Sequence, residues 1–352
     1  MGDIAFGIFD HIDKQSQPLG ATYADRLRVL ERADQAGFYS YHLAEHHATP
    51  LCMAPSPSVF LAAVAQRTTR LRFGPLVYLL PLYHPLRLIE QVCMLDHLSG
   101  GRLDLGVGRG ISPIELGFLN VNASETPERF KEELEILLLG LRGHDRLTFH
   151  GRFHHLENVP IEFVPVQQPH PPIWYPTSTV DRMPWVAERG FNSVLQGGAA
   201  RVKPRLDRYW EVWHAHHSTD GPKPKLGVMR TILLADTEDE ALRLARPAFR
   251  QHYNSLIKLW REHGMHTAAE SFTDDLDEEI RDDKAYVGTA ANVRDQIAQF
   301  VAATDCDYVV TRLMFGDLPI DRILYSLELF INEVMPAFGA PARAHAAAPA
   351  RP

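Results

Sequence analysis

Residues 71–110 read LRFGPLVYLLPLYHPLRLIEQVCMLDHLSGGRLDLGVGRG. The almost unbroken apolar run at 71–79 is typical of a strand that is buried on both faces, as in a parallel sheet covered by helices. A helix is predicted at 85–98, where Ser99-Gly100-Gly101 ends it, and a further strand at 103–107. The stretch therefore predicts a strand, a crossover helix and a second parallel strand.

The same alternation of strand and helix extends in both directions from this unit. We predict further strands at 4–10, 38–43, 172–175, 192–195, 226–235 and 308–315, and further helices at 23–37, 58–69, 127–142, 180–189, 202–216, 238–263, 289–303 and 320–335. Together these make about eight βα units. The pattern favours an α/β fold of the (β/α)8 TIM-barrel type, with a doubly wound open sheet as the structural alternative.

The length of the chain fits one large domain rather than two small ones. It has 352 residues, of which 45% are hydrophobic, and β/α barrels run past about 250 residues as single domains. We expect the barrel domain at 1–338, with an insertion at about 143–171 that holds a small β element. The Ala-, Pro- and Arg-rich tail at 339–352 is expected to be disordered.

Charge and cysteine content exclude several classes of function. The net charge is -8 and no run of Lys and Arg occurs, so we expect no nucleic-acid partner and no acidic membrane partner. Cys52, Cys93 and Cys306 lie far apart, which argues against a disulfide framework or a thiolate metal site. No apolar run approaches the roughly 20 residues of a spanning helix, and no secretory leader is visible. We expect a cytoplasmic protein.

Residues with acidic, basic, imidazole or hydroxyl side chains follow several of the predicted strands. The segments are Asp10-His11, Glu45-His46-His47, Gly108-Arg109-Gly110 and Thr177-Ser178-Thr179. Active sites of β/α barrels lie at the carboxyl ends of the strands. Imidazoles and one guanidinium are therefore expected to converge on one mouth of the barrel.

The Glu45-His46-His47 segment leaves three interpretations open. A histidine there could act as an acid or base near neutral pH, the three residues could bind a metal ion, or the imidazoles could be hydrogen-bonded parts of the core. Neighbouring residues of a strand point to opposite faces, which disfavours a shared metal ion. We expect no metal site.

Two other segments could bind an anion. The glycines around Arg109 allow a ligand to approach the backbone, and the guanidinium offers several donors to a phosphate. Hydroxyls at 177–179, just before a predicted helix, suit the same role. The alternatives are a glycine-rich bend and an ordinary N-cap, and the GxGxG spacing does not match a dinucleotide fingerprint.

Together these motifs resemble the bacterial luciferase-like flavin-dependent monooxygenase family. The matching stretches are HLAEHH at 42–47, LPLYHPLR at 80–87, GVGRG at 106–110, VGT at 287–289 and VMP at 334–336. They span about residues 3–338. Each stretch is short, but their order and spacing together are specific.

The resemblance implies a luciferase-like TIM barrel that uses reduced FMN (FMNH2) and O2. A separate NAD(P)H:flavin reductase would supply FMNH2, and a C4a-peroxyflavin would oxygenate a small, apolar organic substrate. Aldehyde oxidation, Baeyer–Villiger insertion, hydroxylation and desulfonation are all compatible with it. The resemblance also implies a homodimer, with the apolar helices at 58–69 and 85–98 in its interface.

The resemblance assigns cofactor-binding roles. Arg109, Ser178 and Thr179 match residues that bind the FMN phosphate. Leu76 and Val77 match a non-prolyl cis peptide that supports the isoalloxazine ring. Gly108 stands beside the flavin where light-emitting luciferases carry a reactive cysteine, so light emission is not expected.

The resemblance also implies a catalytic and substrate-binding pocket. His46 matches the catalytic histidine, and Glu45, His47 and His84 match residues that line the pocket. Phe9 and Tyr78 are expected in its apolar wall. The acidic segment at about 264–286 falls where the luciferases have a mobile lid, and we expect a lid here that excludes water.

Three rival interpretations remain. Relatives on the same fold use the deazaflavin F420 and transfer hydride without O2. A flavin-binding barrel without turnover is the second rival. A metal-dependent hydrolase using His46 and His47 is the third.

Overall fold

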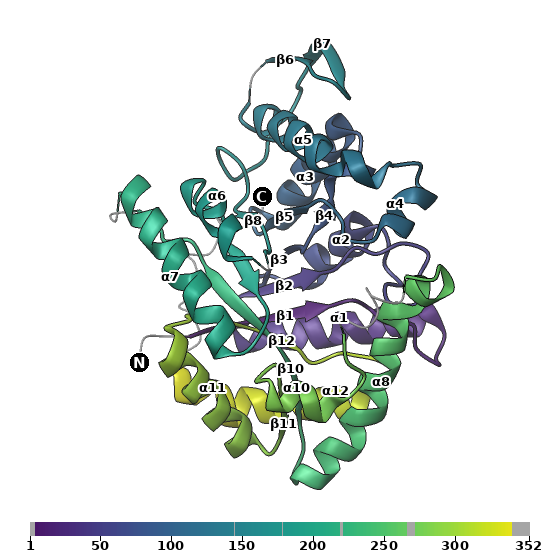
Figure 1. Ribbon diagram of the computed structural model, residues 1–352, viewed down its shortest axis with the longest axis vertical. Coiled ribbons are helices and arrows are strands. Elements are labelled where there is room, and N and C mark those ends of the chain that lie inside the picture. Colours follow the sequence, from purple (N-terminus) through teal and green to yellow (C-terminus); the bar gives the residue numbers. More distant parts are fainter. Residues whose placement is uncertain (1–3, 144, 178, 219–220, 266–271, 340–352) are drawn as a thin grey trace.

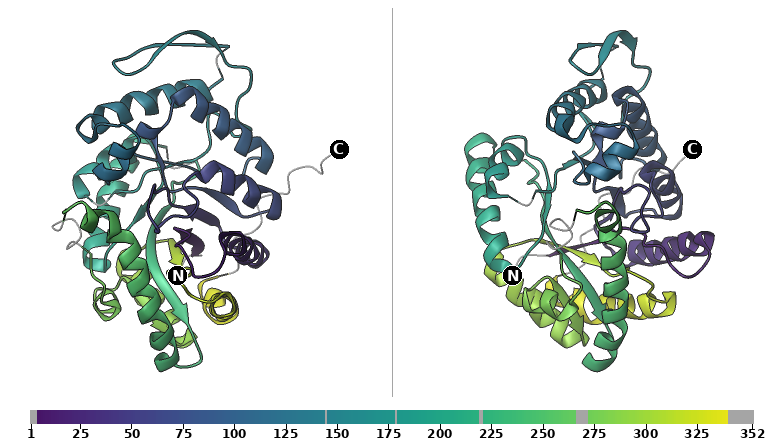
Figure 2. Two further views of the ribbon diagram at one scale, coloured as in Figure 1. Left: turned by 90° about the vertical axis from the view of Figure 1, so that its right-hand side faces the viewer. Right: turned by 45° about the vertical axis from the view of Figure 1, so that its right-hand side comes forward.

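The computed structural model describes residues 4–143, 145–177, 179–218, 221–265 and 272–339. Its centre is a curled, parallel β-sheet enclosed by helices (Figures 1 and 2). The strands are β1 (Ala5–Asp10), β2 (Ser40–Leu43), β3 (Arg72–Pro75), β4 (Tyr78–Leu79), β5 (Leu105–Gly108), β8 (Ile173–Trp174), β9 (Ser193–Leu195), β10 (Leu226–Leu234), β11 (Ala285–Gly288) and β12 (Tyr308–Arg312).

Strand pairing closes this sheet into a ring. One arc runs β9–β10–β12–β1–β2–β3 and a second runs β4–β5–β8, with every pair parallel. Two isolated parallel bridges, Phe73 to Leu103 and Trp174 to Asn192, join the arcs. The ring has one strand position for each predicted βα unit, with β3 and β4 sharing one. It confirms the TIM-barrel expectation and excludes the open sheet.

Helices follow the strands and pack outside the ring. They are α1 (Leu19–Ala36), α2 (Pro57–Arg67), α3 (Pro85–Ser99), α5 (Thr126–Leu141), α6 (Met183–Glu188), α7 (Ala199–His216), α8 (Glu238–Glu262), α11 (Ala290–Thr304) and α12 (Ile320–Leu329). Their ends follow from local sequence. Pro57 and Pro85 occupy first helical positions, and α3 ends at Gly100 in a left-handed conformation with φ of 64°.

Some elements differ from the predictions. The predicted strand at 71–79 is divided into β3 and β4 by the Leu76–Val77 segment. Strand β11 pairs with β10, whereas the sequence predicted the helix from residue 289 and no strand before it. The predicted helix at 320–335 ends at Leu329 and continues as a π-helical turn, η4 (Phe330–Val334). Other short elements are η1 (Leu80–Leu82), α4 (Pro113–Phe118), η2 (Ala123–Glu125), η3 (Val180–Arg182), α10 (Leu276–Arg281) and η5 (Met335–Phe338).

The insertion contains the expected β element. Strands β6 (Arg146–His150) and β7 (His155–Pro160) form an antiparallel hairpin that projects from one end of the molecule (Figure 1). Most of the expected lid segment at about 264–286 is described, including α10 and the first residues of β11, but 266–271 lies outside the described residues. The expected disordered tail lies outside them from residue 340 onward. No helix of the described chain is both long and apolar enough to cross a membrane.

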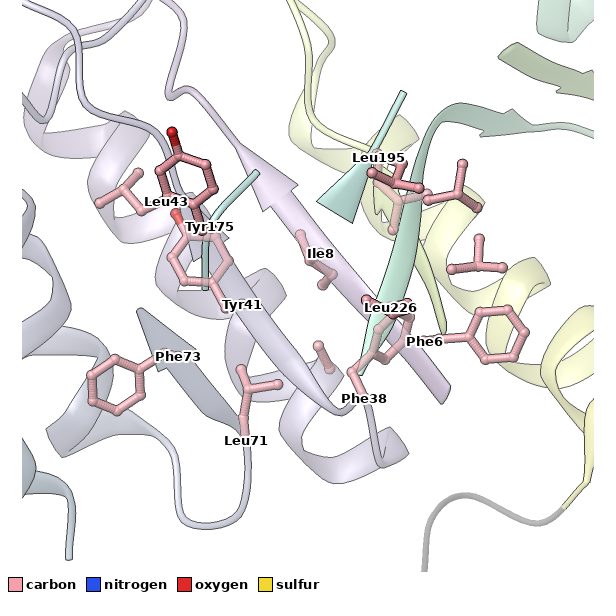
Figure 3. Close-up of a cluster of buried hydrophobic side chains, with 14 of the residues drawn as sticks. Phe6, Ile8, Phe38, Tyr41, Leu43, Leu71, Phe73, Tyr175, Leu195 and Leu226 are labelled. Atoms are coloured by element: carbon pink, nitrogen blue, oxygen red, sulfur yellow. The ribbon is translucent and has the colours of Figure 1, made fainter. Parts of the chain in front are cut away.

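Side chains alternate between two cores. Ile8 of β1 joins the large core between the strands and the surrounding helices, which Figure 3 shows in close-up. The next residue, Phe9, belongs to a separate cluster inside the barrel, together with Leu76, Trp174 and Tyr308. Adjacent strand residues face opposite sides, so each strand contributes to both cores. The interior is filled by side chains, and polar groups that act on a ligand must lie at its rim.

Candidate functional site

Two imidazoles and two carboxylates form a chain of hydrogen bonds after β2. His47 Nε2 lies 2.8 Å from Glu45 Oε1, and the Leu79 backbone N–H donates to Glu45 Oε2 at 3.0 Å. Glu115, from α4, accepts the His47 backbone N–H at 2.7 Å, and its other oxygen lies 3.1 Å from His46 Nδ1. The predicted site residues Glu45, His46 and His47 are thus brought together, with Glu115 between the two histidines.

The buried carboxylates and imidazoles of this hydrogen-bond chain shift one another's pKa values. Burial raises the pKa of the Glu45 carboxyl, although His47 opposes the shift. Burial disfavours the His47 imidazolium, but the hydrogen bond and charge of Glu45, helped by Glu115, raise its pKa. Burial likewise opposes ionisation of Glu115, yet His46 and His47 lower its pKa. Glu115 is therefore an anion that holds His46 by Nδ1 and leaves Nε2 for another partner.

Residues 112–115 contain a local sequence signal for the helix that carries Glu115. Ser112-Pro113-Ile114-Glu115 matches the S-x-x-E pattern that begins helices, and Ser112 Oγ accepts the Glu115 backbone N–H at 3.3 Å. The pattern predicts α4, which the periodicity did not. Ile114 then packs against Ile257 and Trp260 of α8, and this contact fixes α4 at the barrel mouth.

A second polar cluster lies beside the first. Arg312, at the end of β12, donates to Thr231 Oγ1 at 3.1 Å and to His252 Nε2 at 2.8 Å. His252 Nδ1 lies 2.8 Å from Asp13 Oδ2, which also accepts the Gly316 backbone N–H at 2.9 Å. The His11 ring stands between the clusters, with its centroid 5.8 Å from that of His46 and 5.0 Å from that of His252. The sequence did not predict Asp13 or His252 as site residues.

The described cofactor-binding candidates lie in or next to three neighbouring strands: Leu76 and Val77 precede β4, Gly108 ends β5 and Arg109 follows it, and Thr179 follows β8. Strand β5 pairs with β4 on one side, where Leu79 faces Gly108, and with β8 on the other, where Gly106 faces Trp174. The Leu76–Val77 peptide bond is cis, as the family resemblance implied. A Cβ at Gly108 would lie 2.4 Å from Val77 Cγ2, so glycine is needed for this close approach.

Free polar groups follow the same strands. The Arg109 guanidinium forms no hydrogen bond or ion pair with any residue that the structure describes. The exposed Thr179 side chain makes no capping bond to η3. Within the barrel, the buried Trp174 Nε1–H is also without a partner. Ser178 lies outside the described residues. Arg109 and Thr179, which follow the adjacent parallel strands β5 and β8, fit a ligand that carries an anion, whereas the Trp174 N–H is enclosed in the barrel interior.

Two predicted pocket residues lie elsewhere. Tyr78 is fully buried in the outer core, where its hydroxyl lies 2.7 Å from Ser58 Oγ of α2. His84 is exposed at the start of α3, and its ring contacts His154 at the hairpin, with centroids 5.6 Å apart. Neither side chain joins the imidazoles at the mouth. Phe9 does reach it, because its ring lies edge-on to His11 at 4.7 Å. No group of three or more metal-ligating side chains is assembled in the described ranges.

Comparisons with known proteins agree with this geometry. The luciferase-like monooxygenase family model matches residues 4–305. The uncharacterized protein y4wF of Sinorhizobium fredii is 40% identical over 96% of this chain and 98% of its own. The oxygenase component of the flavin-dependent trigonelline monooxygenase of Acinetobacter baylyi is 26% identical over 95% of each chain.

Solved structures share the fold. Monooxygenase RslO1 from Streptomyces bottropensis superposes with a TM-score of 0.84 and 26% identity, over 95% of this chain and 100% of its own. The oxygenating constituent of 3,6-diketocamphane monooxygenase, in complex with FMN, has a TM-score of 0.79 and 23% identity, over 96% and 99% of the two chains. An F420-dependent secondary alcohol dehydrogenase has a TM-score of 0.74 and 16% identity, over 96% and 99%. The last two likenesses concern the fold alone.

Proposed function

Because this chain belongs to the luciferase-like monooxygenase family, we propose that it is a monooxygenase that uses FMNH2 and O2 to oxygenate a small, apolar organic substrate. The main support is the Arg109 guanidinium, which has no partner among the described residues and lies next to Gly108, one strand away from the cis Leu76–Val77 segment. A cation without a carboxylate partner at a barrel mouth suits a phosphate. Reduced FMN, when bound, would supply the electrons that activate O2.

Each group of residues has a distinct part in the proposal. Arg109, Ser178 and Thr179 are proposed to bind the phosphate. Leu76, Val77 and Gly108 would support the ring. Glu115 would orient His46, so that Nε2 holds or moves a proton at the reacting oxygen.

The barrel interior supplies an apolar surface next to these polar groups. Phe9, Ala44, Leu76 and Val194 belong to one buried cluster, and Phe9 contacts His11 at the rim. An apolar wall of this kind binds apolar substrates and excludes water during the reaction. The lid that we expect at about 264–286, in the proposed single domain at 1–338, would close over the same mouth.

Two partners belong to the proposal. A separate NAD(P)H:flavin reductase would supply FMNH2. The trigonelline relative is named as the oxygenase component of a flavin-dependent monooxygenase. A second copy of this chain would cover α2 and α3. Val59, Met94 and Leu98 on these helices are 73%, 56% and 40% exposed, and exposed apolar side chains that gather on adjacent helices indicate an interface.

The decisive experiment is an anaerobic titration of the purified protein with FMNH2, followed by rapid mixing with O2. We expect saturable binding and flavin reoxidation that is slower than that of free FMNH2, through a spectrum unlike either the reduced or the oxidised form. The same titration with F420 distinguishes the hydride-transfer alternative. Binding of F420 without binding of FMNH2 would contradict our proposal and leave the fold assignment intact.

A further inference from the structure

The His11 imidazole is a polar group that the fold buries but does not use. It directly follows β1, and only 9% of the residue is exposed. Its Nδ1 is buried without a hydrogen-bond partner, and neither ring nitrogen bonds to any residue in the described ranges. Nε2 is absent from the buried unpaired atoms, so it reaches the accessible space of the mouth.

The surroundings of His11 keep the ring in place and uncharged. Phe9 packs perpendicular to it, and His252 and His46 stand on its other sides. Burial lowers the pKa of His11 well below its usual value, and His252, His46 and Arg312 act in the same direction. His11 is therefore neutral over the whole physiological pH range.

The buried Nδ1 decides which ring nitrogen carries the hydrogen. An enclosed N–H without a partner is rarer and more costly than an enclosed lone pair without one. The neutral ring therefore holds its lone pair at Nδ1 and its hydrogen at Nε2. His11 thus presents an N–H donor to the mouth of the barrel.

The neighbouring cluster of Asp13, His252 and Arg312 forms no hydrogen bond with His11 among the described residues, so it leaves this donor free. Arg312 can only donate, so His252 Nε2 accepts its hydrogen bond and His252 Nδ1–H must donate to Asp13. Both nitrogens of His252 are therefore used. His46 Nδ1 is engaged by Glu115, and no hydrogen bond joins the other nitrogen of His46 to His11 in the described part of the chain.

We propose that His11 is a substrate-binding residue, whose Nε2–H holds an uncharged carbonyl oxygen of an otherwise apolar substrate beside His46. This inference rests on the proposed monooxygenase function and names a substrate class for it. A carbonyl oxygen complements a neutral N–H donor, and the ring contact with Phe9 continues into the apolar interior.

The charged side chains at the mouth of the barrel disfavour an anionic ligand group next to His11. Glu45, Glu115 and Asp13 lie among the imidazoles. Glu45 and Glu115 already face His47, whose pKa they raise, and Asp13 already attracts the buried Arg312 guanidinium. A carboxylate or sulfonate would meet a neutral ring among carboxylates. Such a ligand would lose hydration without gaining an ion pair.

The test uses the full chain labelled with 15N-histidine, without flavin, in two-bond 15N–1H correlation spectra. We expect His11 to remain neutral with hydrogen on Nε2 from about pH 5.5 to 8.5. The probes are cyclohexanone, cyclododecanone and acetophenone, compared with cyclohexanol and cyclohexanecarboxylate. At least one ketone should shift His11 Nε2, and cyclohexanecarboxylate should bind roughly tenfold more weakly than cyclohexanone.

Two variants of His11 distinguish the contribution of its N–H donor to ketone binding from that of its ring shape. His11→Phe should weaken ketone binding about fivefold to tenfold, and His11→Gln, whose amide N–H can replace Nε2–H, should restore most of it. His214→Gln, on the exposed side of α7, is the matched control and should bind ketones as the wild type does.

Several results would overturn the proposal. They are hydrogen on Nδ1, titration of His11 near its usual pKa, failure of all three ketones to shift its signal, tighter binding of cyclohexanol or the carboxylate than of the ketones, and equal ketone binding by His11→Phe. None of these depends on flavin or O2. A protein that binds ketones at His11 but fails the FMNH2 experiment would contradict only the oxygenase assignment.

Discussion

Glu115 and His46 are 69 positions apart in the chain, yet Oε1 of the carboxylate lies 3.1 Å from Nδ1 of the imidazole. The same carboxylate accepts the backbone N–H of His47 at 2.7 Å. Glu115 thus fixes both the ring and the peptide of the segment after β2. It is a positioning residue, because in the proposed mechanism it acts through His46 and does not itself touch the substrate.

Glu115→Gln should therefore release His46 rather than remove it. In the wild type we expect the neutral His46 ring to carry its hydrogen on Nδ1, where the carboxylate accepts it. The amide of the variant can donate instead, so the other tautomer should become populated, and the pKa of His47 should fall because Glu115 helps to raise it. Histidine 15N spectra report both effects.

Kinetics provide the second measurement for Glu115→Gln. A loosened His46 should slow the step that it assists about tenfold to a hundredfold, while FMNH2 affinity stays unchanged. Glu157→Gln, at the exposed hairpin, is the control. An unaltered His46 tautomer together with full activity would rule out the positioning role.

The barrel could be predicted from the sequence because its signals are local. Continuous apolar runs mark the parallel strands, and Pro57, Pro85 and Gly100 mark helix ends within a few residues. Strand β11 was missed because it has only four residues and lies directly before Thr289, the N-cap of the helix that follows. The cis bond between Leu76 and Val77 has no periodic signature, and only the family resemblance indicated it.

The site was less predictable because its contacts are long-range. Asp13 and His252 are 239 positions apart, and nothing in either local sequence indicates the other. Conversely, Tyr78 lies close in sequence to the predicted flavin segment but faces the outer core, where it meets Ser58. A residue that follows a predicted strand can be placed at the mouth of the barrel from the sequence. The side to which its side chain points depends on strand register, which the sequence does not show.

Arg109→Gln should weaken FMNH2 binding. The guanidinium has no partner among the described residues, so its loss removes a phosphate contact without breaking an internal ion pair. A charged hydrogen bond of this kind corresponds to about a tenfold to hundredfold change in Kd. Thermal stability should be unchanged. Arg142→Gln, exposed after α5, is the control, and equal Kd values for the two variants would remove Arg109 from the phosphate site.

Charges placed on α2 and α3 should separate the proposed dimer. Val59→Glu and Met94→Glu replace apolar side chains that are 73% and 56% exposed, so the folded monomer should tolerate them. Light scattering after size-exclusion chromatography should show a dimer for the wild type and a monomer for the double variant. Val180→Glu, at a position 41% exposed on η3, should remain dimeric. A monomeric wild type would contradict the proposed interface.

His42 should make the folded state sensitive to acid. Its ring is enclosed in the barrel, where Nε2 lies 2.7 Å from the Tyr308 hydroxyl, and burial lowers its pKa to about 4. In the unfolded chain this histidine is protonated below about pH 6.5, whereas in the folded chain it stays neutral down to about pH 4. Because the unfolded state binds more protons between these two values, the free energy of unfolding falls as the pH is lowered through this window. His11, also held neutral, contributes with the same sign.

His42→Gln tests this effect, since it keeps a polar group near Tyr308 but cannot titrate. The slope of unfolding free energy against pH, measured by urea denaturation between about pH 6 and 4.5, should be shallower than in the wild type by up to about 1.4 kcal/mol per pH unit. The variant should be less stable at about pH 8, because glutamine packs less well than an imidazole against Trp174. Parallel stability curves for variant and wild type would mean that His42 is already protonated, or accessible to water, in the folded barrel.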